Sequence, residues 1–328
     1  MHDSCNRNID YLRISVTDRC NLRCIYCMPE AGVDFLPHDR ILSYEEILRI
    51  CRQMAGLGLQ KIKLTGGEPL VRRDLPRLVG RLKQIDGIRT VTLTTNGVLL
   101  ESFLPELTAA GLDAVNISLD TLDPEEYRRI TRFHELDRVL RGIDAALSGS
   151  SRLTVKLNCV PIRSADCREQ ILRLTELARE RLLHVRFIEL MPIGLGEDQE
   201  GFSEPEIRNI IESHYGTLHP YYGKLGNGPS SYYELEGFRG KIGFISAISH
   251  KFCHQCNRVR LTSDGFLKSC LQYGEGTDLK QAMTEGAADE QLQELIRTTV
   301  YHKPAAHQFG TQAERNNIET NIMSQIGG

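Results

Sequence analysis

Short runs of alternating apolar and polar residues recur along residues 10–190, each followed by an amphipathic stretch. Alternation with a period of two is typical of β-strands, and apolar residues at helical spacing are typical of helices that pack on one face. The alternating runs predict six strands, at residues 11–16, 61–65, 89–94, 114–119, 153–159 and 184–190. The amphipathic stretches predict helices near 43–56, 74–85, 99–110, 124–147 and 166–181.

Strands that alternate with helices indicate an α/β fold with a parallel sheet and right-handed crossovers. Six such units are too few to close an eight-stranded barrel, so the pattern predicts an open, incomplete (βα)6 barrel or a doubly wound sheet. Beyond the Gly-rich linker that begins near residue 191, the pattern changes to one helix, a hairpin region and two final helices. We therefore expect a partial barrel over residues 1–192 and a C-terminal α+β region over residues 193–328.

The two faces of each predicted strand differ in character. In the strand at 11–16, for example, Leu12 and Ile14 alternate with Arg13. A barrel strand covered by helices is normally apolar on both faces, so the polar face requires an explanation. An antiparallel sheet with one face in water would give the same alternation, but the intervening helices argue against that alternative.

The polar faces contain five cations, which are Arg13, Lys61, Lys63, Lys156 and Arg186. In a barrel these side chains would point into the lumen. Buried cations without a matching row of carboxylates are costly unless an anion binds among them. A polyphosphate fits such a lumen, because its oxygens accept charge-assisted hydrogen bonds.

Charge and composition narrow the function classes. The chain carries 40 Lys and Arg against 43 Asp and Glu, a net charge of −3, which gives no reason to expect nucleic-acid binding. No apolar run approaches the ~18 residues of a membrane span, and the first residues lack the basic and apolar regions of a secretory signal. We therefore expect a cytoplasmic protein without a membrane or nucleic-acid partner.

Ten cysteines change this picture, because cysteines of a reducing compartment more often bind metal or react than form disulfides. Cys20, Cys24 and Cys27 form a C-x3-C-x2-C group in the loop after the first strand. Cubane [4Fe–4S] clusters usually take four cysteines, so three thiolates would leave one iron open to a substrate or cofactor. A structural zinc site, which needs four ligands, is the less favoured alternative.

A second group, Cys253, Cys256 and Cys270, is ambiguous from its spacing alone. It is compatible with a Cys3His zinc site completed by His250, His254 or His302. It is equally compatible with a second cluster that has an open iron, beside which Arg258 and Arg260 would meet a substrate.

The order of these motifs resembles the radical S-adenosylmethionine (SAM) superfamily. The first cysteine group follows the first strand, Tyr26 precedes its last cysteine, and a Gly-Gly-Glu-Pro loop with Gly67 follows the second strand. Within the superfamily, the chain is similar to the branch that cyclises GTP in the first step of molybdenum-cofactor (molybdopterin) biosynthesis. The likeness covers nearly the whole chain and rests on segments such as KLTGGEPLVRRDL, RFIELMPIG and FCHQCNRVRLTSDGFLKSCL.

The resemblance implies an incomplete (βα)6 radical-SAM barrel and a C-terminal α+β region that carries an auxiliary cluster. It implies that the two cysteine groups hold two [4Fe–4S] clusters. S-adenosylmethionine would bind the open iron of the first cluster, beside Tyr26, Gly67, Ser118, Asn158 and Met191. GTP would bind with its guanine at the second cluster, in contact with Arg13, Lys61, Lys63, Thr94, Lys156, Arg186, Arg258 and Arg260. The implied catalytic residues are Arg258, Arg260, Gly327 and Gly328, the two glycines reaching back into the site from a tail that composition alone would leave disordered.

In the implied reaction, a 5′-deoxyadenosyl radical removes hydrogen from C3′ of GTP, and the C3′ radical attacks C8 of guanine. The resulting aminyl-type radical would then be reduced through the auxiliary cluster. The product would be (8S)-3′,8-cyclo-7,8-dihydroguanosine 5′-triphosphate. The implied partners are an electron donor of the flavodoxin or ferredoxin kind, the next enzyme of molybdopterin synthesis and a second copy in a homodimer.

Two other functions stay open. A peptide-modifying radical-SAM maturase would also combine two kinds of cluster, but such enzymes usually carry more than three auxiliary cysteines, and the basic lumen favours a triphosphate. A zinc-bearing regulatory or scaffold protein would be colourless and free of iron.

Overall fold

The structure is a computed structural model that describes residues 1–149, 153–309, 319 and 321–327. Its N-terminal half alternates strands and helices as the sequence predicts. The strands are β1 (Tyr11–Ser15), β2 (Lys61–Thr65), β3 (Thr90–Thr95), β4 (Ala114–Ser118), β5 (Thr154–Cys159) and β6 (His184–Ile188). The helices are α1 (Tyr44–Gly56), α2 (Leu75–Lys83), α3 (Leu100–Ala109), α4 (Pro124–Thr131), α5 (Leu136–Ser148) and α6 (Cys167–Glu180). The connecting segments that the structure describes contain the short 3-10 helices η1 (Pro69–Val71), η2 (Gly194–Asp198) and η3 (Cys253–Gln255).

The C-terminal half contributes short strands and four helices among the described residues. The strands are β7 (His219–Tyr221), β8 (Ser231–Glu234), β9 (Ile242–Ile245), β10 (Arg258–Leu261), β11 (Phe266–Lys268) and β12 (Gly276–Asp278). The helices are α7 (Glu204–Tyr215), α8 (Leu279–Thr284), α9 (Asp289–Tyr301) and α10 (Met323–Ile326).

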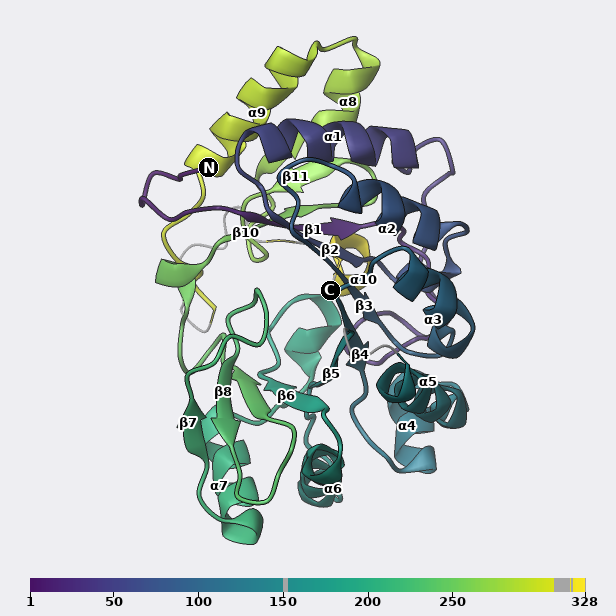
Figure 1. The fold of residues 1–328 in the computed structure, drawn as a ribbon, viewed down its shortest axis with the longest axis vertical. Helices are drawn as coiled ribbons and strands as arrows, with labels where there is room; N and C mark the ends of the chain where they lie inside the picture. Colours follow the sequence, from purple (N-terminus) through teal and green to yellow (C-terminus); the bar gives the residue numbers. More distant parts are fainter. Residues whose placement is uncertain (150–152, 310–318, 320, 328) are drawn as a thin grey trace.

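All twelve strands of the described residues form one sheet, in the order β12-β11-β10-β1-β2-β3-β4-β5-β6-β9-β8-β7. The six strands predicted from the sequence lie in chain order and in parallel, which confirms the partial barrel. The sheet is longer than predicted, because β10 and β9 continue it in parallel at the β1 and β6 edges. Figure 1 shows the sheet as an open curve with α1 to α6 along its outer side and α10 (Met323–Ile326) within the curve.

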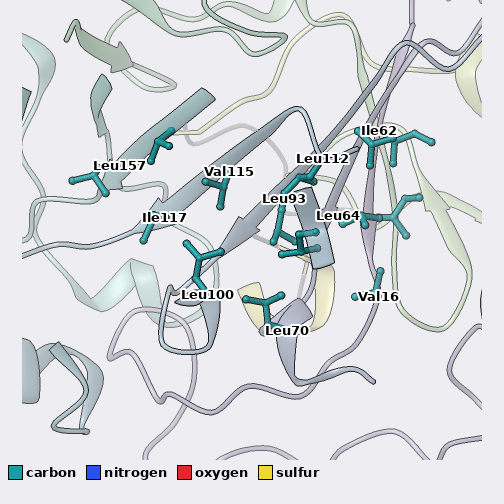
Figure 2. Packing of buried hydrophobic residues seen from close by; sticks show 14 of the residues in the cluster. Val16, Ile62, Leu64, Leu70, Leu93, Leu100, Leu112, Val115, Ile117 and Leu157 are labelled. Atoms are coloured by element: carbon teal, nitrogen blue, oxygen red, sulfur yellow. The ribbon is translucent and has the colours of Figure 1, made fainter. Parts of the chain in front are cut away.

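The main hydrophobic core lies between the sheet and the outer helices. Apolar side chains from the strands meet side chains such as Leu100 from α3 and Leu70 from the loop after β2 (Figure 2). Val16, Ile62, Leu64, Leu93 and Val115 are fully buried there. Because one face of each strand is committed to this core, the alternate residues face the concave side of the sheet.

Side-chain caps begin two of the helices, and one expectation about the helices is wrong. Ser43 and Glu46 form a capping box at the start of α1, and the Asp123 side chain accepts a hydrogen bond at the start of α4. The single helix expected over 124–147 is two helices instead. Arg132 ends α4 in the left-handed conformation, with φ 65°, and α5 starts four residues later.

Among the helices of the described residues, none combines the length and the apolar character that crossing a membrane requires.

Candidate functional site

The loops after β1 and β2 pack directly on each other at the carboxyl end of the sheet. The amide of Gly67 donates to the carbonyl oxygen of Thr17 (2.7 Å), and the amide of Glu68 donates to that of Arg19 (2.8 Å). A Cβ atom on Gly67 would lie 2.3 Å from the Arg19 carbonyl oxygen. Only glycine therefore allows this close approach, which sets the cysteine loop against the end of β2.

The cysteine loop brings three free, partly buried thiols together. The amide of Cys27 closes a turn onto the carbonyl oxygen of Cys24 (2.9 Å), and the amide of Leu22 lies 3.4 Å from Sγ of Cys20. Burial raises the pKa of Cys20 to about 11 and that of Cys27 to about 12. Burial, and then the neighbouring Cys27, also raise the pKa of Cys24. A ligand that binds all three as thiolates must therefore bring positive charge, as an iron–sulfur cluster does.

Two carboxylates outside the predicted site residues, the buried Glu68 and the partly buried Asp120, connect the loops at this end of the site. Glu68 accepts hydrogen bonds from the Thr95 hydroxyl (2.7 Å) and the amide of Asn96 (2.6 Å), which ties the glycine loop to the end of β3. Asp120 accepts one from the Tyr26 hydroxyl (2.7 Å). Burial raises the pKa of Glu68 to about 7 and that of Asp120 to about 6. Both groups therefore position loops.

The residues expected to contact S-adenosylmethionine lie around the same end. Ser118 and Asn158 are register partners on β4 and β5. Met191 follows β6 and packs beside a small apolar cluster of Ile193, Phe309 and Ile326. Asn158 has a second commitment, because its amide oxygen accepts a hydrogen bond from the guanidinium of Arg186.

The polar faces of the strands bring the predicted cations close to one another. Arg13 is the register partner of Lys63 on β2 and of Arg260 on β10. Burial, and then the charges of cations including Arg186 and Arg13, hold the pKa of Lys63 well below its usual range. Burial also lowers the pKa of Arg13 to about 10. Since Arg186, Arg13, Lys156 and Arg258 all lower the pKa of Lys63, an anion would relieve the repulsion among these cations.

The guanidinium of Arg186 is hydrogen-bonded to neutral groups. It donates to the amide oxygens of Asn116 (2.7 Å) and Asn158, which are neutral partners. Its Nε is buried without a hydrogen-bond partner among the described residues. Asn116 also donates to the Thr94 hydroxyl (3.4 Å), so the predicted Thr94 belongs to the same polar network.

Lys61 has a carboxylate partner. Its amine lies 2.7 Å from Asp10, whose other oxygen accepts a hydrogen bond from the Asn257 side chain (2.7 Å). The expectation that all five cations lack a matching carboxylate is therefore wrong for Lys61. Strand alternation could not predict this pair, because Asp10 lies just before the alternating run of β1.

A cavity of about 430 Å³ opens beside these cations. Its walls include Lys61, Arg186, Cys256 and Arg258, together with the Gly-rich segment 222–230. Lys156 reaches this segment and donates a hydrogen bond to the carbonyl oxygen of Leu225. The cavity therefore joins the cations of the sheet to the second cysteine group.

The second group also presents free, partly buried thiols. The amide of His307 lies 3.5 Å from Sγ of Cys253, and the guanidinium of Arg258 lies 4.0 Å from Sγ of Cys256. Burial alone would raise the pKa of Cys256, but the charges of Arg258 and Lys303 lower it to about 7. This thiol is therefore ready to bind a metal centre as a thiolate.

Two cations hold the backbone around the second cysteine group. Arg7 donates to the carbonyl oxygens of Cys253 (2.8 Å) and Ala305 (2.9 Å) and pairs with Asp3 (2.6 Å). Lys303 donates to the carbonyl oxygens of Arg258 (2.9 Å) and Ser269. The first residues of the chain and the segment after α9 thus fix this group in place.

The three histidines considered as a fourth zinc ligand lie at the surface. His250 is 3.4 Å from Glu204, and the ring of His302 packs against that of Tyr301 at 5.4 Å between centroids. His254 is exposed. Within the described part of the chain, no group of three or more His, Cys, Asp and Glu side chains is placed to hold a single metal ion.

The end of the chain reaches the same region. Arg260 donates a hydrogen bond from Nη1 to the carbonyl oxygen of Gly327 (2.6 Å). Gly327 has φ +77°, and a Cβ atom there would lie 2.9 Å from Cβ of Ser15 on β1. Gly328, the second glycine of the prediction, lies outside the described residues.

Comparison with known proteins gives full-length relatives. Two family models match the chain: Radical SAM superfamily over residues 14–175 and Molybdenum Cofactor Synthesis C over residues 183–309. A GTP 3′,8-cyclase of Clostridium perfringens (strain 13 / Type A) is 43% identical over 328 residues, and one of Syntrophomonas wolfei is 46% identical over 331 residues. Each alignment covers 100% of both chains.

Among solved structures, Streptococcus suis SuiB bound to S-adenosylmethionine has a similar fold, with a TM-score of 0.58 at 17% identity. The match covers 84% of this chain and 65% of the SuiB chain. At this identity the likeness concerns the fold alone.

Proposed function

The chain belongs to the GTP 3′,8-cyclase family of radical SAM enzymes, and from this premise we propose that it converts GTP to (8S)-3′,8-cyclo-7,8-dihydroguanosine 5′-triphosphate, the first step of molybdenum-cofactor biosynthesis. The observation that supports the substrate is the cation set on the concave side of the sheet, which consists of Arg13, Lys61, Lys63, Lys156 and Arg186. Lys156 and Arg186 are buried, and the other three are partly buried. A triphosphate would bring negative charge to this set, and its oxygens suit guanidinium and ammonium donors.

The first cysteine group would hold the radical centre. When bound, a [4Fe–4S] cluster and S-adenosylmethionine supply an organic radical that removes a hydrogen atom from a substrate. Cys20, Cys24 and Cys27 would ligate three irons of the cluster and leave the fourth to the cofactor. Gly67 keeps the neighbouring loop close to the cysteine loop, and Tyr26, Ser118, Asn158 and Met191 would line the cofactor.

GTP would bind along the cation set. Lys61, Lys63, Lys156 and Arg186 would meet the phosphates, with Lys156 exchanging the Leu225 carbonyl oxygen for a phosphate oxygen. Arg13, Thr94, Arg258 and Arg260 would contact the nucleoside beside the second cysteine group. Orientation is the main task of these residues, because hydrogen-atom transfer depends on how closely the two carbons approach. Segment 222–230 would limit the entry of water from the cavity side.

We also propose that Cys253, Cys256 and Cys270 hold a second [4Fe–4S] cluster, whose open iron would receive the guanine, and that Gly327 and Gly328 act with Arg258 and Arg260 at the reacting atoms. The chemistry needs two electrons from outside the chain, one to cleave S-adenosylmethionine and one to reduce the radical left after cyclisation, and we propose a flavodoxin- or ferredoxin-like protein as the donor. We further propose that the product passes to the next enzyme of molybdopterin synthesis and that the protein forms a homodimer in the cytoplasm. The proposed boundary between its two domains lies near residue 192.

A nucleotide-dependence assay tests the function. The protein would be reconstituted anaerobically with iron and sulfide, reduced, and given S-adenosylmethionine with GTP, ATP or no nucleotide. We expect 5′-deoxyadenosine and an equal amount of cyclised nucleotide with GTP alone. Cleavage that is indifferent to GTP would overturn the substrate assignment and favour a peptide-modifying enzyme. The absence of cleavage from iron-loaded protein would overturn the radical reaction.

The second cluster has its own test in the iron content. Two cubanes predict about eight irons per chain, and Cys256→Ala should remove about half of them. Iron analysis and electron paramagnetic resonance of the reduced protein would measure this loss and identify the remaining cluster. Cys5→Ala, at an exposed thiol, is the matched control and should keep all the iron. An unchanged iron content in Cys256→Ala would contradict the proposal.

A further inference from the structure

Strands β10 and β11 hold the end of the chain at two points. They pair antiparallel with Arg260 directly opposite Lys268. Arg260 binds the carbonyl oxygen of Gly327, and Lys268 forms an ion pair with Glu319. We call the described residues 319 and 321–327 the tail segment. Two of its contacts therefore come from one cross-strand pair of cations.

The ion pair is deeply buried, with the Lys268 side chain 2% and the Glu319 side chain 3% exposed. Glu319 is also fixed through its backbone, because its amide donates to the carbonyl oxygen of Gln272 (2.6 Å). Its second carboxylate oxygen accepts a hydrogen bond from the amide of Asn321 (2.8 Å). The carboxylate thus binds both the sheet and the beginning of the segment that leads to Gly327.

Beyond Asn321 the tail segment packs through apolar contacts. Ile326 is buried in a small cluster with Ile193 and Phe309, against which Met191 and Met323 also pack. Such contacts are not directional, so they allow the helix α10 to shift along the cluster. An ion pair with fixed hydrogen bonds specifies one register, which is the best-attested use of a buried charge pair.

Register matters at Gly327, where the fit is tight. The site that a Cβ would take is 2.9 Å from Cβ of Ser15 and 3.4 Å from Cγ2 of Thr65. A shift of the tail segment by one residue would bring Ile326 to this position, and its side chain has no room there. The same shift would leave Arg260 opposite the carbonyl oxygen of Ile326 in place of that of Gly327.

We propose that Lys268 and Glu319 are positioning residues that fix the register with which the tail segment enters the lumen, so that Gly327 meets Arg260. The effect on turnover rests on the proposed function, whereas the effect on the tail segment does not. Loss of the pair should release the tail segment and uncouple cyclisation from cleavage of S-adenosylmethionine, with both cysteine groups intact.

The test uses the full-length protein in three forms: Glu319→Gln, the double variant Lys268→Met with Glu319→Gln, and the control Lys83→Met. Lys83 forms a partly buried ion pair with Asp113 (2.8 Å) remote from the tail segment. Hydrogen–deuterium exchange would follow the amides of Gln325 and Gly327, which are hydrogen-bonded to Ile322 and Met323. Iron content, 5′-deoxyadenosine and cyclised nucleotide would be measured on the same samples.

In Glu319→Gln we expect at least tenfold faster exchange of these amides, unchanged iron, and at least tenfold less cyclised nucleotide per 5′-deoxyadenosine. The double variant leaves no unpaired buried charge, so it should fold, and it should show the same release of the tail segment. Lys83→Met should match the wild type. Wild-type exchange in the double variant, or released amides with an unchanged product ratio, would overturn the proposal. If the wild type cyclised no GTP, the proposed function would be wrong. The exchange data would still show whether the Lys268–Glu319 pair holds the tail segment.

Discussion

At the scale of single residues, the pKa of the Lys156 amine is unusual for a lysine. Burial, and then the charge of Arg186, lower its pKa to about 7. In an unfolded chain a lysine titrates near 10.4, so between about pH 7 and 10 the unfolded state binds more protons than the folded state. The contribution of Lys156 to stability is therefore least below pH 7 and rises as the pH increases towards 10.

This titration predicts how nucleotide binding depends on pH. A triphosphate prefers the ammonium form, so GTP binding at pH 7.5 should take up protons, and the Lys156 contribution to affinity should fall about tenfold between pH 6 and 8. Calorimetric titration in two buffers of different ionisation enthalpy would count the protons. Lys156→Arg, which stays charged, should take up fewer. Equal proton uptake by the wild type and Lys156→Arg would contradict the assignment of this uptake to Lys156. Lys156→Ala should lose GTP binding and retain its iron.

Gly67 gives a second prediction at this scale. Gly67→Ala would push a Cβ into the Arg19 carbonyl oxygen, so we expect a loss of about 2–3 kcal/mol of stability and poorer iron retention. Gly80, within α2, is the control. Its Cβ would meet only Ala110, at 3.9 Å, and Gly80→Ala should stabilise the protein by about 0.5–1 kcal/mol. Urea denaturation would compare the two, and equal midpoints would refute the steric argument.

Strand alternation predicted which cations lie together on the concave side of the sheet. Arg13, Lys63, Lys156 and Arg186 gather because each occupies the polar phase of a strand whose other phase is core. Alternation carries no information about loops or strand ends, and the partners of Lys61 and Glu68 lie there. Such contacts depend on how loops from different units meet, which a local pattern does not encode.

At the scale of elements, local sequence patterns likewise predicted some strands and helices and missed others. The six long strands have clear alternation and helices between them, so they were predictable. Strands β9 and β10 have four residues each and join the sheet next to β6 and β1, far away in sequence. The break between α4 and α5 was hidden as well, because Arg132 takes the left-handed conformation that usually reveals itself as glycine.

Arg132 has a reason to end the helix, and this reason is testable. Its guanidinium donates to the carbonyl oxygens of Arg23 (2.8 Å) and Met28 (3.0 Å), on either side of the last two cysteines of the first group. Arg132→Ala keeps the Cβ and so the backbone strain, but loses both bonds. We expect a destabilisation of about 2 kcal/mol by urea denaturation and faster loss of iron to a chelator.

The matched control for this change is Arg128→Ala on the same helix. Arg128 is exposed and meets Glu125 only at 4.0 Å, so its removal should cost no more than about 0.5 kcal/mol. If the two variants lost stability equally, the contacts to the cysteine loop would not explain the position of the helix end.

At the scale of the whole molecule, the two halves share one sheet. The C-terminal half supplies the strand beside β1 and the strand beside β6, so both outer edges of the predicted barrel are covered by it. We therefore expect the metal-free protein to unfold in urea in a single transition, with coincident curves from far-ultraviolet circular dichroism and tyrosine fluorescence. A fragment of residues 1–192 should aggregate. Two separate transitions would contradict this expectation.

The pairing of β10 with β1 also has a consequence in time. Asn257 binds Asp10 from 247 residues further along the chain. At about 5–20 residues per second, a ribosome needs about 12–50 s to synthesise that interval. During translation the β1 edge therefore stays unpaired on the β10 side until that strand has emerged. A cell that makes this protein must keep this edge from pairing with other chains during that interval.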